Sequence, residues 1–117
     1  MNSEELKNRT KDFALRVLRF VDLLPKGRTQ DVLAKQLVRA VTSVGANYRA
    51  ACKARSKADF ISKITILEEE ADETQYWLEL IAAHEKVDEK EITELLTEAM
   101  ELTAIFTASG KTAKRNR

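Results

Sequence analysis

The chain has very few of the residues that interrupt secondary structure or cross-link a fold. Its 117 residues include one proline, three glycines and one cysteine, and aromatic residues make up 6%. So few turn-forming residues predict few turns and long elements. The single cysteine excludes an intramolecular disulfide and is typical of proteins in a reducing cytoplasm.

The sequence also lacks a long hydrophobic run and an excess of either charge. No apolar segment approaches the roughly 20 residues that a membrane span requires. The N-terminal segment MNSEELKNRTKD is polar and does not resemble a signal peptide. We therefore expect a cytoplasmic protein that does not interact with membranes. Lys and Arg (20) nearly balance Asp and Glu (19), so the net charge of +1 favours no class of partner.

Hydrophobic residues form 44% of the chain and recur at the three- and four-residue steps of amphipathic helices. The turn sequence LLPKGRT and two capping signals, Ser56 with Asp59 and Asp88 with Glu91, separate four such segments. Ser3 is the predicted N-cap of the first segment. The pattern predicts an all-α protein, an antiparallel up-down-up-down four-helix bundle in one domain. The domain covers residues 1–110, with helices at about 3–24, 29–55, 57–85 and 88–109, then Gly110 as a stop and a short, flexible basic tail at 111–117.

The third predicted helix carries a run of acids that raises the question of a metal site. Di-iron bundles carry a Glu-x-x-His motif on each of two helices, but the only histidine, His84, has Ile81 three residues before it. Calcium-loop, zinc, phosphate-loop and catalytic-triad patterns are also missing. Cys52 lies at the edge of an apolar stripe, where a small buried hydrophobe is expected. The sequence predicts neither an enzyme nor a metal or cofactor, and it identifies no small-molecule substrate.

Ion pairing is the other use for these acids. Helices joined by a tight turn run side by side, so residues equidistant from the turn lie close together. Glu70 lies on the flank of the apolar stripe and needs a partner, for which Arg39 and Asn47 are the nearest candidates. Because adjacent acids repel one another, others are expected to meet basic residues of a second subunit. The candidates for ion pairs, within or between subunits, are Arg39, Arg49, Glu68, Glu69, Glu70, Asp72 and Glu73.

Small side chains surround much of the second predicted helix, which includes Ala40, Ser43, Gly45, Ala46, Ala50 and Ala51. Glycine inside a helix costs about 1 kcal/mol relative to alanine, so Gly45 is expected to permit a close backbone approach. One bundle requires a single small stripe, and two indicate a helix packed on both sides. The pattern favours a homo-oligomer, although the helix propensity of alanine is an alternative explanation.

Residues 43–81, SVGANYRAACKARSKADFISKITILEEEADETQYWLELI, closely resemble the signature of a bacterial four-helix-bundle family related to the 23S rRNA intervening-sequence proteins. QLVRAVTSVGANY, residues 36–48, is similar to the family's second-helix motif, and the resemblance covers about residues 10–106. It implies a cytoplasmic ring, commonly a homopentamer, without established catalytic residues. Some members are encoded by insertions in 23S rRNA genes. A distant relative, the accessory variability protein of diversity-generating retroelements, works with reverse transcriptase and nucleic acid.

Two functions of different classes follow from these observations. The first is a non-enzymatic, homo-oligomeric scaffold or adaptor. The second is an oligomer that binds RNA or DNA, since a ring would multiply any basic patch of its subunit. The candidate nucleic-acid contacts are Arg49, Lys53, Arg55, Lys57, Lys111, Lys114, Arg115 and Arg117.

Overall fold

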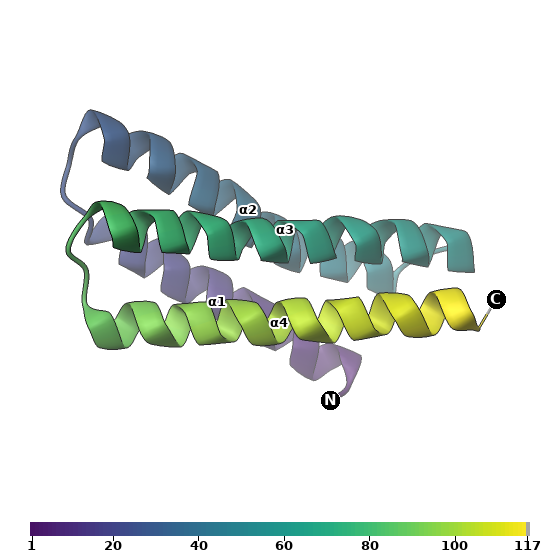
Figure 1. The fold of residues 1–117 in the computed structure, drawn as a ribbon. Helices are drawn as coiled ribbons and strands as arrows, with labels where there is room; N and C mark the ends of the chain where they lie inside the picture. The colour runs from purple at the N-terminus through teal and green to yellow at the C-terminus, as the bar shows by residue number, and fades with distance from the viewer. Residues whose placement is uncertain (117) are drawn as a thin grey trace.

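The computed structural model describes residues 1–116 and consists of four α-helices (Figure 1). The described residues contain no β-strand, which confirms the predicted all-α class. The helices are α1 (Ser3–Asp22), α2 (Arg28–Cys52), α3 (Lys57–His84) and α4 (Glu89–Arg115).

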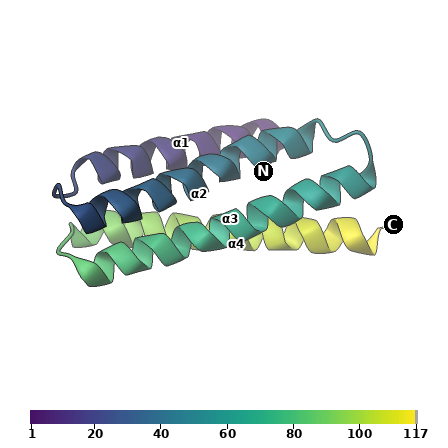
Figure 2. The same cartoon turned by 90° about the horizontal axis from the view of Figure 1, so that it is seen from above.

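The three loops alternate between the two ends of an elongated molecule. The α1–α2 and α3–α4 loops lie at one end, whereas the α2–α3 loop lies at the other, near the end of α4 (Figure 1). Seen from above, α1 lies beside α2 and α3 lies beside α4 (Figure 2). The molecule measures 47 × 24 × 20 Å. Its long axis follows from α3, whose 28 residues span about 42 Å at 1.5 Å per residue.

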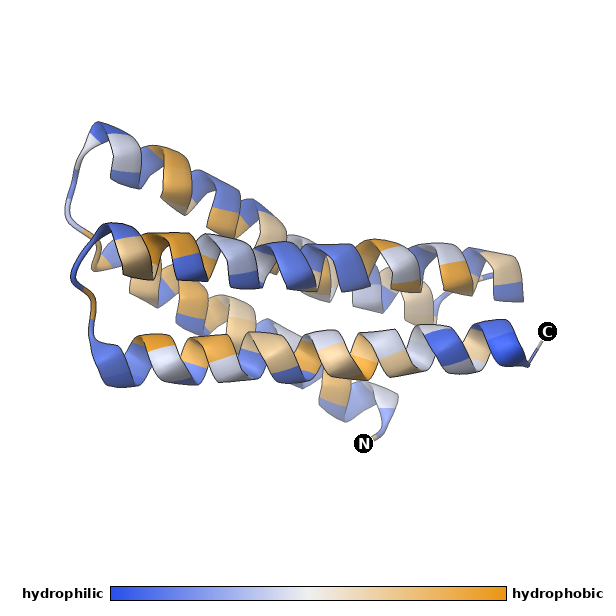
Figure 3. Cartoon of the chain, viewed as in Figure 1, coloured by the Kyte–Doolittle hydropathy of each residue, from blue (hydrophilic) through white to orange (hydrophobic). Residues whose placement is uncertain are grey.

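Each helix buries one apolar stripe in the core of the bundle. Hydrophobic residues recur along every helix between polar ones (Figure 3), as expected for helices with one buried and one solvated side. Tyr48 and Phe106 pack with their ring centroids 5.8 Å apart. Burying one large apolar side chain contributes about 1.5–3 kcal/mol, so this core holds the helices together. Its largest fully buried side chains include Leu37, Ile64, Leu67, Leu78, Ile81, Leu95, Leu102 and Phe106.

Capping side chains fix where three of the helices begin. Ser56 and Asp88 each accept a hydrogen bond from the backbone N–H three residues later, at 3.0 and 2.8 Å, and both predicted capping signals are therefore confirmed. The cap of α1 is Asn2, whose side chain accepts from the N–H of Glu5 at 2.8 Å. The predicted cap, Ser3, is the first residue of the helix itself.

The predicted C-terminal boundaries of α2 and α4 are wrong. Helix α2 ends at Cys52 rather than at residue 55. Helix α4 continues through Gly110 to Arg115, so residues 111–115 of the expected flexible tail are helical, and Arg117 lies outside the described residues. Gly110 is buried, and a Cβ there would lie 3.2 Å from the Cγ2 atom of Ile64. The glycine therefore permits close packing of α4 on α3 and does not end the helix.

Candidate functional site

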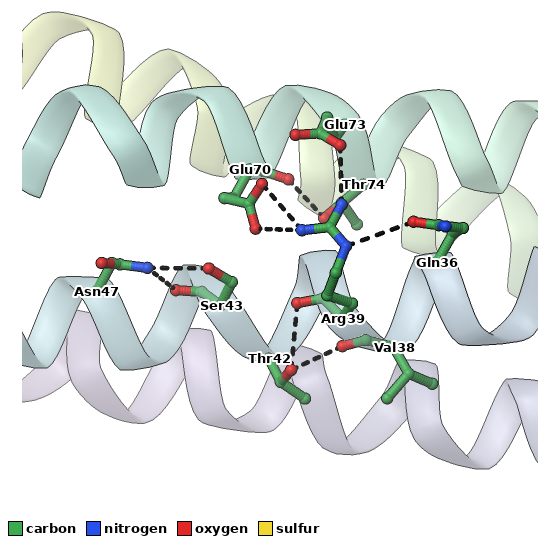
Figure 4. A network of polar contacts seen from close by, with 9 residues as sticks. All are labelled: Gln36, Val38, Arg39, Thr42, Ser43, Asn47, Glu70, Glu73 and Thr74. Carbon is green, nitrogen blue, oxygen red and sulfur yellow. Dashed lines mark hydrogen bonds and ion pairs between the residues drawn. The ribbon is translucent and has the colours of Figure 1, made fainter.

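Arg39 of α2 connects to two acids of α3 (Figure 4). Its Nη1 donates to both carboxylate oxygens of Glu70, at 2.9 and 3.3 Å, and its Nη2 donates to Glu73 at 2.9 Å. The Nε of Arg39 donates to Gln36 at 3.4 Å. The Glu70 side chain is 11% exposed and that of Arg39 is 49% exposed. A cation that reaches in from the surface thus neutralises a mostly buried carboxylate.

The two glutamates also interact with each other. A side-chain hydrogen bond with Glu70 and partial burial raise the pKa of Glu73 above its ordinary value, although Arg39 lowers it. A hydrogen bond between two carboxyl groups requires a proton, and this requirement favours the protonated form of Glu73. The protonation of Glu73 in the folded protein therefore depends both on Glu70 and on Arg39.

Asn47, the other candidate partner of Glu70, bonds within its own helix. Its Nδ2 donates to the carbonyl oxygen and to the hydroxyl oxygen of Ser43, both at 2.9 Å (Figure 4). The buried Thr74 donates its hydroxyl to the carbonyl oxygen of Glu70 at 2.8 Å. Among residues 1–116, Arg39 alone therefore forms an ion pair with Glu70.

The other acids of the run point in different directions. Glu68 faces α4, where it accepts a hydrogen bond from the hydroxyl of Thr107. Glu69 and Asp72 are exposed, and neither side chain has a hydrogen bond or ion pair within residues 1–116. Arg49 on α2 is likewise exposed and unpaired over the same range. Within residues 1–116, the predicted ion-pair residues thus divide into three groups. Arg39, Glu70 and Glu73 form an intramolecular cluster, Glu68 bonds to α4, and the side chains of the other three have no intramolecular partner.

The candidate nucleic-acid contacts gather at one end of the molecule. Lys53 and Arg55 lie in the connection between α2 and α3, at the same end as the C-terminus of α4 (Figure 1). The ammonium group of Lys57 donates to the backbone carbonyl of Asn116, which joins the two segments directly. The exposed cations of the α4 end are Lys111, Lys114 and Arg115, whereas Arg117 lies outside the described residues.

Potential metal ligands do not gather into a site in the part of the chain that the structure describes. Within residues 1–116, no three His, Cys, Asp or Glu side chains come together as a possible metal site. Burial, together with a hydrogen bond to Cys52, raises the pKa of Tyr48 to about 12, so this phenol stays protonated at neutral pH. Cys52 is exposed and not buried as expected.

Sequence reasoning missed a second set of ion pairs, which joins α1 to α4. Arg9 donates from Nε and Nη2 to Glu98, and from Nη2 to Glu101, all at 2.7 Å. Hydrogen bonding to Glu98 raises the pKa of Arg9 above its ordinary value. One heptad later, Arg16 donates to Glu91 at 2.9 Å and to Glu94 at 3.1 Å. The matching seven-residue spacing of the arginines and of the glutamate pairs is the signal that would have identified these contacts.

No helix described for residues 1–116 combines the length and apolar character that a membrane crossing requires. None of the curated proteins matches this chain. Among solved structures, a crystal structure of a protein with unknown function from the S23 ribosomal protein family of Bacteroides thetaiotaomicron is similar, with 33% identity and a TM-score of 0.85. The match covers 95% of this chain and 99% of that one. The family model for 23S rRNA-intervening sequence proteins matches residues 3–108, and the chain therefore belongs to this family.

Proposed function

We propose that the protein is a non-enzymatic scaffold or adaptor that acts as a homo-oligomer, with antiparallel up-down-up-down bundles arranged in a pentameric ring. One observation carries the proposal. Glu69 and Asp72 have no partner within residues 1–116, and they lie on the same side of α3 as the partly exposed Ile66 and Tyr76. Large apolar side chains that are exposed together mark interaction surfaces.

The chemistry of this surface suits a protein partner. Tyrosine is enriched at protein interfaces because it combines a large apolar ring with a hydroxyl group. Tyr76 is 54% exposed, and its ring lies edge-on to Trp77 with the centroids 5.0 Å apart. The neighbouring side chain thus orients the exposed ring before any partner binds, which lowers the entropic cost of association.

Light scattering coupled to size exclusion tests the assembly at micromolar concentration. The expected mass is five times the 13.3 kDa of one chain. A different multiple would correct the ring size and keep the scaffold. A monomer over the whole concentration range would contradict the proposal.

A second candidate function is nucleic-acid binding, favoured by the gathering of cations at one end of the bundle. Lys53, Arg55 and Lys57 lie there, and Lys57 links this segment to the end of α4. A ring would bring several such ends together and multiply weak phosphate contacts. The remaining cations of this end are Lys111, Lys114 and Arg115.

Fluorescence anisotropy with labelled RNA and DNA, measured at several salt concentrations, tests this second function. Binding through phosphate contacts weakens steeply as salt rises. Lys53→Glu with Arg55→Glu is expected to abolish the binding. Lys90→Glu, at the other end of the bundle, is the control and should bind normally. Absence of binding at low salt, or equal loss in both variants, would reject the second function.

A further inference from the structure

An unpaired acidic surface lies on α3, which we call the acidic ridge. It consists of Ile66, Glu69, Asp72 and Tyr76, all exposed. Its two carboxylates meet no cation within residues 1–116, and its apolar members are 39% and 54% exposed. A helix face of this kind combines apolar area with a charge that a partner could neutralise.

A surface with the opposite charge lies between α1 and α2, which we call the basic groove. The groove has a volume of about 500 Å³. Glu4 on its rim lies 3.8 Å from the Nζ of Lys7, whereas Lys11 and Arg49 meet no carboxylate within residues 1–116. Three cations line the groove together with small side chains: Lys7, Lys11 and Arg49, with Ala14, Gly45 and Ala46.

Gly45 in this groove is not explained by packing within the chain. A Cβ at this position would lie 3.5 Å from the Oγ1 of Thr10 and 3.7 Å from its Cβ, which are ordinary van der Waals distances. Alanine would therefore fit, and it would stabilise the helix relative to glycine. The absence of a side chain instead leaves the groove open for an element from outside the chain.

We propose that the acidic ridge of one copy docks into the basic groove of a second copy. The small side chains of the groove let the two helices approach closely, since interaxial distances of about 8–10 Å depend on the side chains at the contact. Ile66 and Tyr76 supply apolar area at this contact, and Glu69 and Asp72 neutralise Lys11 and Arg49. Paired desolvated charges also determine which surfaces recognise each other.

The two surfaces lie on different helices, so the contact is heterologous. Each copy keeps a free groove after its ridge has docked and can therefore accept a further copy. Contacts of this type close into a ring when the rotation between copies allows it. This inference rests on the proposed homo-oligomer and adds the surfaces through which its subunits meet.

Charge reversal with light scattering tests the pairing. Asp72→Arg and Arg49→Glu are each expected to raise the dissociation constant of the assembly at least tenfold, whereas the double variant restores the mass of the unmodified protein. Glu89→Arg and Lys90→Glu, on α4, apply the same charge changes away from both surfaces and should leave the mass unchanged. Circular dichroism of each variant verifies that the helices are retained.

Ala46→Trp provides a test that does not depend on charge. Ala46 is exposed in the single chain, so a larger side chain fills the groove without entering the core. The variant should remain folded and dissociate. If the unmodified protein is a monomer, both this inference and the proposed function fail. If it assembles while Ala46→Trp and both single charge variants stay assembled, or while the double variant is not restored, only the pairing of ridge and groove fails.

Discussion

Two helix–helix contacts of the bundle, which we call the α2–α3 seam and the α1–α4 seam, contain arginine–glutamate ion pairs that differ in how deeply the glutamates are buried. At the α2–α3 seam, Arg39 binds Glu70, whose side chain is 11% exposed. At the α1–α4 seam, Arg9 and Arg16 each bind two glutamates whose side chains are between 24% and 57% exposed. These α1–α4 pairs border an open groove of about 690 Å³.

We expect burial of the carboxylate, rather than the number of hydrogen bonds, to determine how much such an ion pair contributes to stability. The carboxylate of Glu70 cannot return to water when its cation is removed, so the full cost of its desolvation appears. A glutamate at the α1–α4 seam regains water and loses little. Arginines with similar hydrogen bonds are therefore expected to contribute much to the stability of the fold at the α2–α3 contact and little at the α1–α4 contact.

The largest effect is expected at the deeper seam. Arg39→Ala should lower the free energy of unfolding by about 2 kcal/mol because it leaves Glu70 without a charged donor. Arg39→Lys keeps the charge but lacks the planar guanidinium whose two Nη atoms bond separately to Glu70 and Glu73, so its loss should be smaller. Urea unfolding at matched protein concentration measures both variants. Equal stability of Arg39→Ala and the unmodified protein would contradict the assignment.

A smaller effect is expected at the exposed seam. Arg9→Ala should cost about 1 kcal/mol and Arg16→Ala about half as much, because the pairs of Arg16 are more exposed. Both losses should shrink at high salt, which screens exposed charges, whereas the loss in Arg39→Ala should persist. Urea unfolding at low and high salt makes the comparison. If Arg16→Ala costs as much as Arg39→Ala, exposure does not explain the difference between the seams.

The hydrophobic period and the capping residues predicted most of the fold. Ser56 and Asp88 act locally, since each bonds to an N–H only three residues later, and such signals are readable in a sequence. Gly110 was misread because its role depends on Ile64, which lies on another helix. A glycine that permits helix packing looks the same in sequence as one that ends a helix.

Among the charged residues too, contacts near a loop are easier to predict from the sequence than contacts between distant helices. The proximity of Arg39 to Glu70 follows from their similar distance to the short α2–α3 loop. In the structure, the Nη1 atom of Arg39 lies 2.9 Å from the Oε2 atom of Glu70. Arg9 and Glu98 are 89 residues apart, and no single loop joins the first helix to the last one. For this pair, the matching seven-residue spacing of the arginines and of the glutamate pairs was the available signal. The rotation of α3 about its axis determines which acids face outward, as Glu69 does. This rotation is fixed by the apolar side chains that α3 buries in the core.

The smallest effect is expected in the pH dependence of stability, which reports the ionisation of Glu73 beside Glu70 and Arg39. Glu73 has a raised pKa, mainly because of its hydrogen bond with Glu70, so the folded state holds this proton more tightly than the unfolded state does. The resulting stabilisation is fully present below the ordinary pKa of 4.5 and is lost as the pH rises through the raised value. Glu73→Gln cannot titrate and lacks this dependence. The stability of the unmodified protein relative to Glu73→Gln should therefore fall as the pH rises above 4.5 and through the raised pKa of Glu73. Urea unfolding over a range of pH measures it, with Glu69→Gln as the control for charge removal on the exposed face of α3. A relative stability that rises with pH would mean that Arg39, and not Glu70, governs the ionisation of Glu73.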